Sequence, residues 1–221
     1  EAVGTSDPLV MVVGETPSVV DDIERSPFAD NAGELLRDAL ESVGLQEHEI
    51  AFTHVVKCRP DDGKISKRAI DLCRHYVLEE IAYFQPKVVL LVGNSPLRAL
   101  LGEHGITTWH GVVVEREETV YIPIYHPNYV LNNAGILEDW VDGISKAVDV
   151  IEHGIDDDSH RMTFPLTLDE VEEMVAYLED HDLIAYDVET ASLDPFAEGA
   201  RIPVFSLAAG ERTFAVPLDH V

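Results

Sequence analysis

Short apolar runs alternate along the first two thirds of the chain with segments whose apolar positions recur every three or four residues. The runs have the length and composition of buried strands, at residues 9–13, 50–56, 87–92 and 119–124. The recurring pattern predicts amphipathic helices at residues 33–43, 66–84, 95–101 and 136–152. Strands that alternate with helices predict an α/β domain with a parallel four-stranded sheet and helices on both faces, and residues 111–115 are a candidate short extra strand.

A polar and acidic stretch interrupts this pattern after residue 152, and the alternation then restarts. The restarted pattern predicts a helix at 168–179 and strands at 184–189, 204–209 and 213–216. We therefore expect a first domain at 1–152, an acidic linker at 153–162 and an incomplete second domain at 163–221. Because the second pattern stops before a core could close and the chain does not begin with Met, we expect a section of a longer polypeptide.

The chain is strongly acidic, yet it has enough apolar residues for a large core. Of its 221 residues, 42 are Asp or Glu and 15 are Lys or Arg, and 46% are hydrophobic. Acids spread along the whole chain favour a surface adapted to concentrated salt, where self-repulsion is screened; an ordinary acidic protein and a basic partner are the alternatives. Basic residues gather only between 57 and 74, which predicts a phosphate-facing patch: Lys57, Arg59, Lys64, Lys67, Arg68 and Arg74.

The sequence has neither the pattern of a membrane span nor that of a secretion signal. No apolar run approaches the ~18 residues that a spanning helix needs, and the first residues lack the basic and apolar regions of a signal peptide. Two cysteines cannot form a disulfide framework, so Cys58 and Cys73 are either core thiols or half of a metal site. We therefore expect a cytoplasmic protein with no membrane partner.

Polar side chains follow three of the predicted strands in the first domain. Glu15 comes after the first strand, His54 lies within the end of the second, and His126 follows the fourth. Open α/β sheets bind their ligands beyond the carboxyl ends of parallel strands. Each residue taken alone is more often a surface or capping group, but together the three predict a ligand site at one edge of the sheet.

Four motifs of the first domain resemble those of the family 4 uracil-DNA glycosylases, in the same order. The run GETPSVVDDIERSPFADNAGELL at 14–36 has the spacing of the family's Gly-Glu-Ala-Pro-Gly, Pro-Phe and Ala-Gly signature. THVVKCRP at 53–60 is similar to the family's Thr-Asn-Val-Val-Lys-Cys-Arg-Pro. KVVLLVGNSPLRALLG at 87–102 and IYHPNYVL at 124–131 resemble its Leu-Gly strand and its His-Pro motif. The resemblance covers about residues 9–150 and implies a three-layer α/β/α domain.

This resemblance implies a protein that flips a uracil out of single-stranded or damaged DNA and hydrolyses its N-glycosidic bond. Phe28 would stack on the flipped base, and Glu15 with the backbone of Thr16, Pro17 and Ser18 would lie beside the base or the attacking water. His126 would stabilise the anionic leaving group. The phosphate contacts would come from the basic segment and the His126 loop: Lys57, Arg59, Lys64 and Lys67.

The sequence departs from the family at the residues that contact the base. His54 stands where the family's base-recognising Asn is expected, and an imidazole cannot both donate and accept as an amide does. Thr16 and Ser18 replace small residues in a loop whose backbone approaches the base closely. The departures leave open a glycosylase of altered specificity, a glycosylase that uses His54 as a reactive group, and a non-catalytic DNA-binding module.

Cys58 and Cys73 resemble the second pair of the family's four [4Fe-4S] ligands. A cluster of this kind needs four thiolates. In the family, the first pair of cysteines lies upstream of the first strand, at positions that would fall before residue 1 of this chain. The resemblance therefore implies either a cluster completed by further residues or two buried thiols without a cluster.

The tail IAYDVETASLD at 184–194 resembles the first exonuclease motif of the proofreading domain in family A DNA polymerases. Asp187 and Glu189 lie two residues apart on a predicted strand, so both face the same side and could share Mg²⁺. The resemblance implies the beginning of a ribonuclease H-like exonuclease fold, whose remaining metal carboxylates would lie beyond residue 221. A solvated strand end is the alternative explanation of the two acids.

A glycosylase-like domain followed by a proofreading exonuclease is the order at the front of certain phage-type DNA polymerases. We therefore expect the partners to be DNA and the rest of a prokaryotic or viral polymerase chain. The alternative is a non-catalytic module that positions DNA for the polymerase. An acidic metabolic α/β enzyme is a third hypothesis, and it predicts no binding of DNA at any salt concentration.

Overall fold

The computed structural model divides the chain into two compact units, Glu1–Ile155 and Asp156–Val221. It describes residues 2–61, 63–116, 119–155, 162–163, 165, 167–189, 201–202, 204–210 and 212–218. Within these residues, no helix combines the length and the apolar character needed to cross a membrane.

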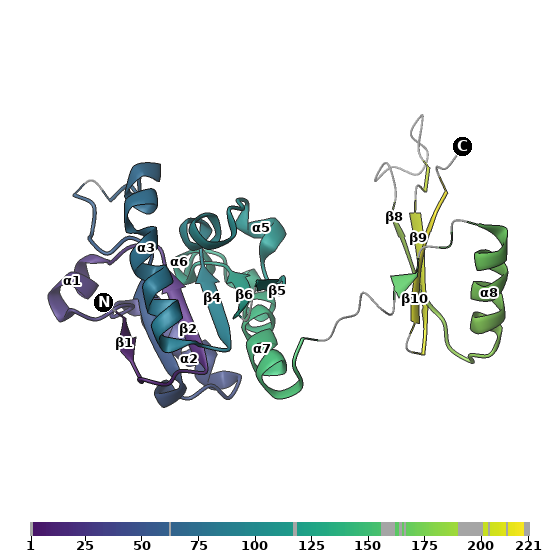
Figure 1. Cartoon of the computed structure of the whole chain (residues 1–221), viewed down its shortest axis with the longest axis horizontal. Helices are drawn as coiled ribbons and strands as arrows, with labels where there is room; N and C mark the ends of the chain where they lie inside the picture. The colour runs from purple at the N-terminus through teal and green to yellow at the C-terminus, as the bar shows by residue number, and fades with distance from the viewer. Residues whose placement is uncertain are drawn as a thin grey trace. The chain divides into compact units, whose positions relative to one another are not determined.

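The first unit is built on a six-stranded sheet with the strand order β1-β3-β2-β4-β6-β5 (Figure 1). Four central strands run parallel, each bonded to its neighbour in register: β2 (Val10–Gly14), β3 (Ile50–His54), β4 (Val88–Val92) and β6 (Thr119–Ile124). Two short strands pair antiparallel at the edges: β1 (Val3–Gly4) and β5 (Val114–Arg116). The predicted parallel four-stranded sheet is confirmed as the centre of this larger sheet.

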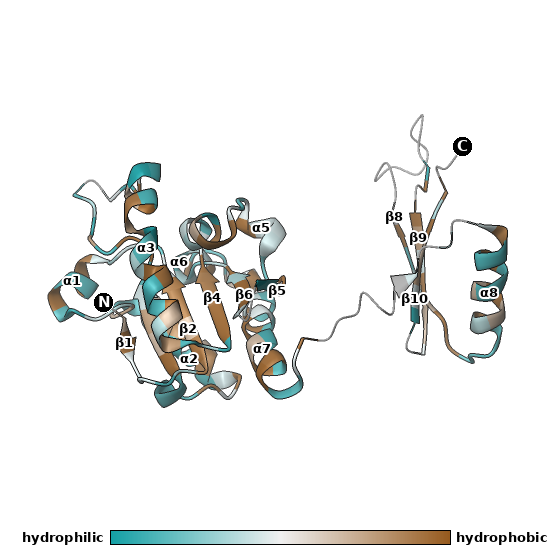
Figure 2. Cartoon of the chain, viewed as in Figure 1, coloured by the Kyte–Doolittle hydropathy of each residue, from teal (hydrophilic) through white to brown (hydrophobic). Residues whose placement is uncertain are grey.

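Helices cover both faces of the sheet, because successive strand residues point to opposite sides. One core contains Val10, Val12, Leu90 and Ile122 with the apolar stripes of α2 (Asn31–Ser42) and α7 (Leu137–His153). The other contains Met11, Val13, Leu91 and Tyr121 with α3 (Lys67–Phe84) and the π-helical turn η2 (Leu97–Leu101). In Figure 2 the central strands are brown, whereas the helices over them mix brown and teal residues. The three-layer α/β/α architecture is therefore confirmed.

Shorter helical segments connect the layers and shape the edge of the sheet where the strands end. They are α1 (Val19–Glu24), η1 (Glu47–Glu49), α4 (Asn94–Pro96), α5 (Ile106–Trp109), α6 (Pro127–Leu131) and η3 (Ala134–Ile136). The long helix α3 begins as predicted, with the Ser66 side chain accepting a hydrogen bond from the backbone N–H of Ala69.

The structure adds details that the hydrophobic pattern did not predict. Strand β1 was not expected, because two residues carry no recognisable alternation. Strand β3 ends at His54 and not at residue 56; beyond it, the N–H groups of Val55 and Val56 donate to the carbonyls of Gly14 and Glu15. The predicted extra strand is β5, which begins at residue 114, three residues after the predicted start at residue 111.

The second unit contains a four-stranded sheet with the order β7-β10-β9-β8. Its strands are β7 (Met162–Thr163), β8 (Ala185–Glu189), β9 (Val204–Ala209) and β10 (Arg212–Pro217). Helix α8 (Leu168–Glu179) buries Met174 and Leu178 against Phe214 and Val216. Helix α8 and strand β9 have the predicted bounds, and residues 190–200 between β8 and β9 lie outside the described residues.

Candidate active site

The side chains of Glu15, His54 and His126 meet in one pocket of about 450 Å³ at the carboxyl edge of the sheet. They come from the ends of β2, β3 and β6, as the sequence predicted. The other walls come from the segment between β2 and α2, the first turn of α2, two residues of α6 and two residues before α3: Thr16, Pro17, Ser18, Asp21, Phe28, Asp30, Ala32, Asn128, Tyr129, Gly63 and Ile65.

Glu15 is held in place by the backbone of the neighbouring strand end. Its Oε1 accepts a hydrogen bond of 2.9 Å from the backbone N–H of Ser95. Gly93, at φ 94°, lies so close that a Cβ there would be 2.8 Å from the same oxygen. The carboxylate is half-buried and lines the pocket, so the fold fixes its orientation before any ligand arrives.

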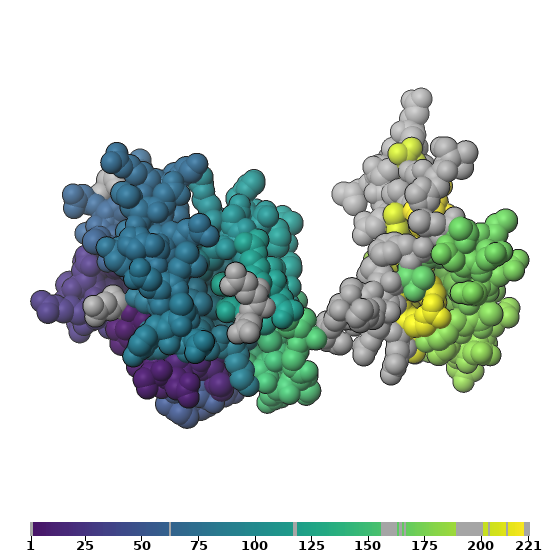
Figure 3. Space-filling view, viewed as in Figure 1, coloured from purple at the N-terminus to yellow at the C-terminus, as the bar shows by residue number. Residues whose placement is uncertain are grey.

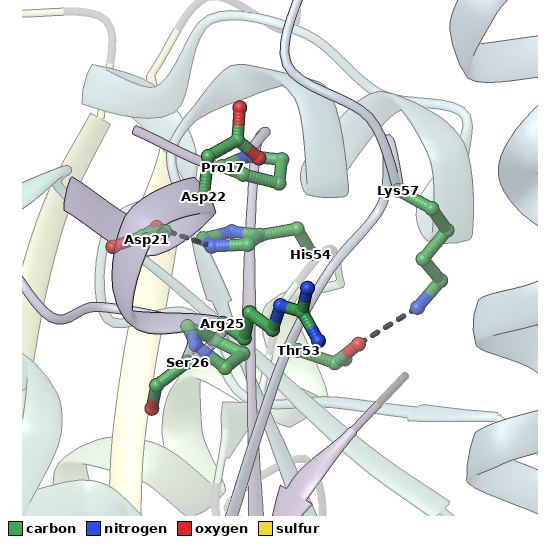
Figure 4. Close-up of a pocket in the computed structure, with 9 residues that line it drawn as sticks. Pro17, Asp21, Asp22, Arg25, Ser26, Thr53, His54 and Lys57 are labelled. Atoms are coloured by element: carbon green, nitrogen blue, oxygen red, sulfur yellow. Dashed lines mark hydrogen bonds and ion pairs between the residues drawn. The ribbon is translucent and has the colours of Figure 1, made fainter. Parts of the chain in front are cut away.

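Asp21 and His54 form a buried pair at the bottom of the site, with 5% and 6% of their surfaces exposed. His54 Nε2 lies 3.0 Å from Asp21 Oδ2. The pair also lines a smaller pocket of about 230 Å³, where Asp21 reaches His54 from α1 (Figure 4). Burial raises the pKa of the Asp21 carboxyl, but hydrogen bonds with His54, Ala29 and Ser18 outweigh it and hold the pKa below its ordinary value.

Asp21 was not among the predicted site residues, although the sequence contains a signal for it. Ser18 caps α1: its side chain accepts from the N–H of Asp21, and the Asp21 carboxylate accepts from the N–H of Ser18. The spacing Ser-x-x-Asp is that of a reciprocal cap, with Asp in the place of the commoner Glu or Gln. A cap alone would not have predicted the contact with His54, which joins segments 33 positions apart.

Phe28 lies beside this pair in a backbone conformation that is rare for its residue type. Its φ is 56°, only 4% of it is exposed, and its ring centroid is 4.8 Å from that of His54 and 5.9 Å from that of Phe52. Gly33 makes this conformation feasible, because a Cβ there would be 1.9 Å from the Phe28 carbonyl oxygen. The Pro-Phe and Ala-Gly parts of the first motif thus act together in shaping one wall of the pocket.

His126 faces the same pocket from the N-cap position of α6. Its Nδ1 accepts a hydrogen bond of 3.2 Å from the backbone N–H of Asn128, so the hydrogen of the neutral ring is on Nε2. Burial lowers the pKa of His126, and the carboxylates of Glu15 and Asp30 oppose this effect only in part. The ring is therefore suited to donate a hydrogen bond while neutral.

The loop after Glu15 contacts the segment that follows β3. Thr16 Oγ1 donates to the carbonyl of Cys58 over 3.1 Å, and Pro17 lines both pockets. The backbone N–H of Ser18, which was expected to face the base or the water, instead donates to Asp21.

The predicted phosphate contacts do not share one environment. Lys57 is mostly buried, and its ammonium donates to Glu80 and to Thr53, a contact drawn in Figure 4. Arg59, Lys64 and Lys67 are exposed on the segment before α3 and in its first turn. Figure 3 shows the blue surface of this segment and α3 spread over the face of the first unit in view.

The described residues do not fit an iron-sulfur cluster by themselves. Cys58 is exposed and Cys73 packs partly buried against the core under α3. The chain has two cysteines where a [4Fe-4S] cluster takes four, and the described residues contain no group of three or more side chains able to hold a metal ion.

The two acids of the tail lie on β8, opposite Ser206 and Val204 of β9. Asp187 is exposed, and the side chain of Glu189 lies outside the described residues, as does the segment 190–200. Of the two acids expected to bind Mg²⁺, the structure therefore describes the backbone of both but only the carboxylate of Asp187.

Comparison with known proteins identifies the family of the first unit. The family model described as the uracil DNA glycosylase superfamily matches residues 2–144. The chain belongs to this superfamily. Its first unit is thus a uracil-DNA-glycosylase-like domain, which confirms the resemblance drawn from the four motifs.

Individual relatives divide into two kinds. The type-4 uracil-DNA glycosylase of Archaeoglobus fulgidus is 27% identical over 154 residues, 65% of this chain and 77% of its own. That of Pyrobaculum aerophilum is 33% identical over 93 residues, 42% of this chain; the match spans about half, 47%, of the relative. The DNA polymerase of Bacillus phage SP01 is 23% identical over 219 residues, 93% of this chain but 23% of the polymerase. The similarity to this polymerase thus extends through the second unit.

Proposed function

We propose that the first unit binds a base flipped out of single-stranded or damaged DNA and hydrolyses its N-glycosidic bond. The meeting of Glu15, Phe28 and His126 in one pocket carries this proposal, because these residues come from separate segments and supply a carboxylate, an aromatic surface and a neutral donor. Extruding a base costs a few kcal/mol, and the cost is smallest for single-stranded or mispaired bases.

In the proposed reaction, a water oxygen bonds to the sugar carbon while the N-glycosidic bond breaks. The electron pair of the broken bond leaves with the base. Glu15, oriented by the N–H of Ser95, accepts the water proton. His126 donates a hydrogen bond from Nε2 to the anionic base, and Phe28 stacks on its face. Thr16 and Pro17 border the base, and the exposed Arg59, Lys64 and Lys67 contact phosphates.

Lys57 has a different place in this proposal. Its ammonium is already paired with Glu80 and Thr53, so a phosphate contact would require it to exchange these partners. We therefore assign the phosphate contacts first to the three exposed side chains and regard Lys57 as a support for the end of β3.

The test is the release of uracil from a labelled single strand at high salt, with wild type compared with His126→Ala and with His104→Ala, a change at an exposed loop histidine. We expect release by wild type and His104→Ala and a loss of 100-fold or more for His126→Ala, the typical effect of removing a donor to a developing anion. Equal background release by all three proteins would refute hydrolysis.

That refuting result would favour the second candidate, a non-catalytic module that binds DNA ahead of a polymerase. One observation supports this alternative: Phe28 packs on His54, which is itself paired with Asp21, so the pocket wall is closed by internal contacts. Retained binding of single-stranded DNA without release of any base would establish it.

We further propose that the second unit begins a 3′–5′ exonuclease domain and that the chain is the front section of a polymerase. The match to the phage polymerase across both units supports this proposal. Asp187 and Glu189 would then bind Mg²⁺ together with carboxylates of a longer chain. Sequencing the gene past the codon of Val221 tests the fusion: polymerase motifs should follow, and a stop codon there would refute it.

Two further proposals concern the environment of the protein. Cys58 and Cys73 would supply half of a [4Fe-4S] site only in a longer chain with two more thiolates. Iron and sulfide in an anaerobically purified longer protein would support this proposal, and their absence would refute it.

The net charge of -27 suits a prokaryotic or viral cytoplasm of high salt. A thermal midpoint that rises steeply up to 1 M NaCl is expected, and one that does not rise would refute the salt adaptation.

A further inference from the structure

The hydrogen bonds around Asp21 determine where His54 carries its hydrogen. Asp21 Oδ1 accepts from the N–H of Ala29 over 2.8 Å, and Oδ2 accepts from the N–H of Ser18 over 3.1 Å. Backbone N–H groups can only donate, so both oxygens are acceptors, and the lowered pKa of Asp21 keeps its carboxyl ionised. The remaining partner of Oδ2 is His54 Nε2, and it must therefore be a donor.

A hydrogen on Nε2 leaves Nδ1 of the neutral ring as a bare acceptor. This atom is buried, and among the described residues it has no hydrogen-bond partner. A buried polar atom without a partner is destabilising, and most such atoms in proteins are satisfied by protein, water or ligand. An unsatisfied acceptor on a residue that lines the pocket is thus a feature that a ligand could complete.

The position of Nδ1 agrees with this role. His54 lines the pocket together with Glu15 and His126. A Cβ at Gly14 would be 2.4 Å from Nδ1 and 2.5 Å from Cζ of Phe28, so the acceptor and the tip of the aromatic ring meet over this glycine. A shift of the Phe28 side chain, as a base comes to stack on it, would uncover Nδ1 to that base.

We propose that His54 recognises an N–H group of the flipped base through Nδ1, and that Asp21 is the positioning residue that makes Nδ1 an acceptor. This inference rests on the proposed binding of a flipped base. The ligand class is a base with an imino N–H or an exocyclic amine at this edge, such as uracil, hypoxanthine or cytosine. An Asn at this position could also donate to a carbonyl oxygen, whereas His54 in this form cannot.

The first test is the tautomer itself, which is independent of any activity. In the 221-residue chain labelled with ¹⁵N-histidine, the His54 signals are those that disappear in His54→Phe. We expect them to show a hydrogen on Nε2 and none on Nδ1 in wild type. In Asp21→Asn, the amide can donate to Nε2, so we expect the hydrogen on Nδ1. A hydrogen on Nδ1 in wild type would overturn the inference.

The second test measures binding, by fluorescence anisotropy, of single-stranded oligonucleotides that differ at one base and carry a 2′-fluoro sugar there, which resists hydrolysis of the N-glycosidic bond. Uracil is compared with N3-methyluracil, which keeps both carbonyls but lacks the N–H. We expect wild type to bind the uracil strand about 10-fold more tightly, about 1.4 kcal/mol. His54→Phe removes the acceptor and keeps a ring, so its remaining preference measures the steric effect of the methyl group alone. Asp21→Asn should reduce or reverse the preference.

The outcomes separate this inference from the proposed function. Binding of the uracil strand above that of a strand with an abasic analogue supports base binding in general. If that binding occurs but the preference over N3-methyluracil is the same in wild type and His54→Phe, base binding stands and the role of His54 is refuted. If neither base improves binding over the abasic strand, the proposed function and the ligand assigned to His54 both fail.

Discussion

Replacing Gly33 by Ala should displace Phe28 in the pocket wall and destabilise the first unit, without replacing any side chain that faces a ligand. Gly33 lies in the first turn of α2, where its N–H donates to Asp30. A Cβ there would be 1.9 Å from the carbonyl oxygen of Phe28, 2.3 Å from its carbonyl carbon and 2.7 Å from its Cα. All three atoms belong to the backbone, so no side-chain rotation relieves the clash.

The expected cost in stability is the sum of two destabilising terms and one stabilising term. Overpacking destabilises by about 1–3 kcal/mol, and a displaced Phe28 ring also loses its contacts with Phe52 and His54, worth about 1 kcal/mol. Ala in place of Gly within a helix returns up to about 1 kcal/mol. The net loss should be about 2 kcal/mol, which at a urea slope of about 2 kcal/mol/M lowers the midpoint by about 1 M.

Tryptophan fluorescence is a suitable assay, because both tryptophans of the chain, Trp109 and Trp140, lie in the first unit. Gly135→Ala is the matched control: a Cβ there meets nothing within 4 Å, so its urea midpoint should stay close to that of wild type. If Gly33→Ala unfolds at the same urea concentration as this control, the close packing of Gly33 on Phe28 does not support the pocket, and the reasoning is refuted.

Further predictions concern the charged groups of the site. The pKa of Asp21 is lower in the folded chain than the value of about 3.9 in unfolded chains. The ionised carboxyl therefore stabilises the fold fully above that pH, and this stabilisation is lost as the pH falls below it. Wild type should lose stability more steeply than Asp21→Asn between about pH 5 and pH 2, and parallel curves would contradict the pairing. Gly93→Ala should displace the Glu15 carboxylate and lower base release about 100-fold with DNA binding retained; unchanged release would contradict the assigned orientation. Glu80→Gln removes the charge that pairs with the mostly buried Lys57 just beyond β3, so the urea midpoint should fall by the equivalent of about 1–3 kcal/mol, and a midpoint equal to that of wild type would show that the pair is not stabilising.

The central fold could be predicted because its strands are buried on both faces. Residues such as Val88–Val92 form continuous apolar runs, and the helices between the runs carry one apolar stripe each. Strand β1 could not be predicted in this way: it has two exposed residues, and its pairing with β3 depends on the backbone alone.

Part of the candidate site could also be predicted, because strand ends of a parallel sheet meet at one edge. This rule brought Glu15, His54 and His126 together correctly. The rule says nothing of how α1 folds back, and it therefore missed Asp21. It also could not show that Lys57 is occupied by Glu80, since a cluster of basic residues in sequence does not indicate which of them have acidic partners in space.

Glu80 connects parts of the first unit that are far apart along the chain. Its Oε1 accepts from the N–H of Ala2 over 3.0 Å, and its Oε2 accepts from Thr53 over 2.8 Å and from the ammonium of Lys57. A change at any one of positions 53, 57 or 80 leaves the other two mismatched. As related chains diverge, these three positions should therefore change together. Engineering that alters the charge of the basic segment should likewise vary all three positions at once and not Lys57 alone.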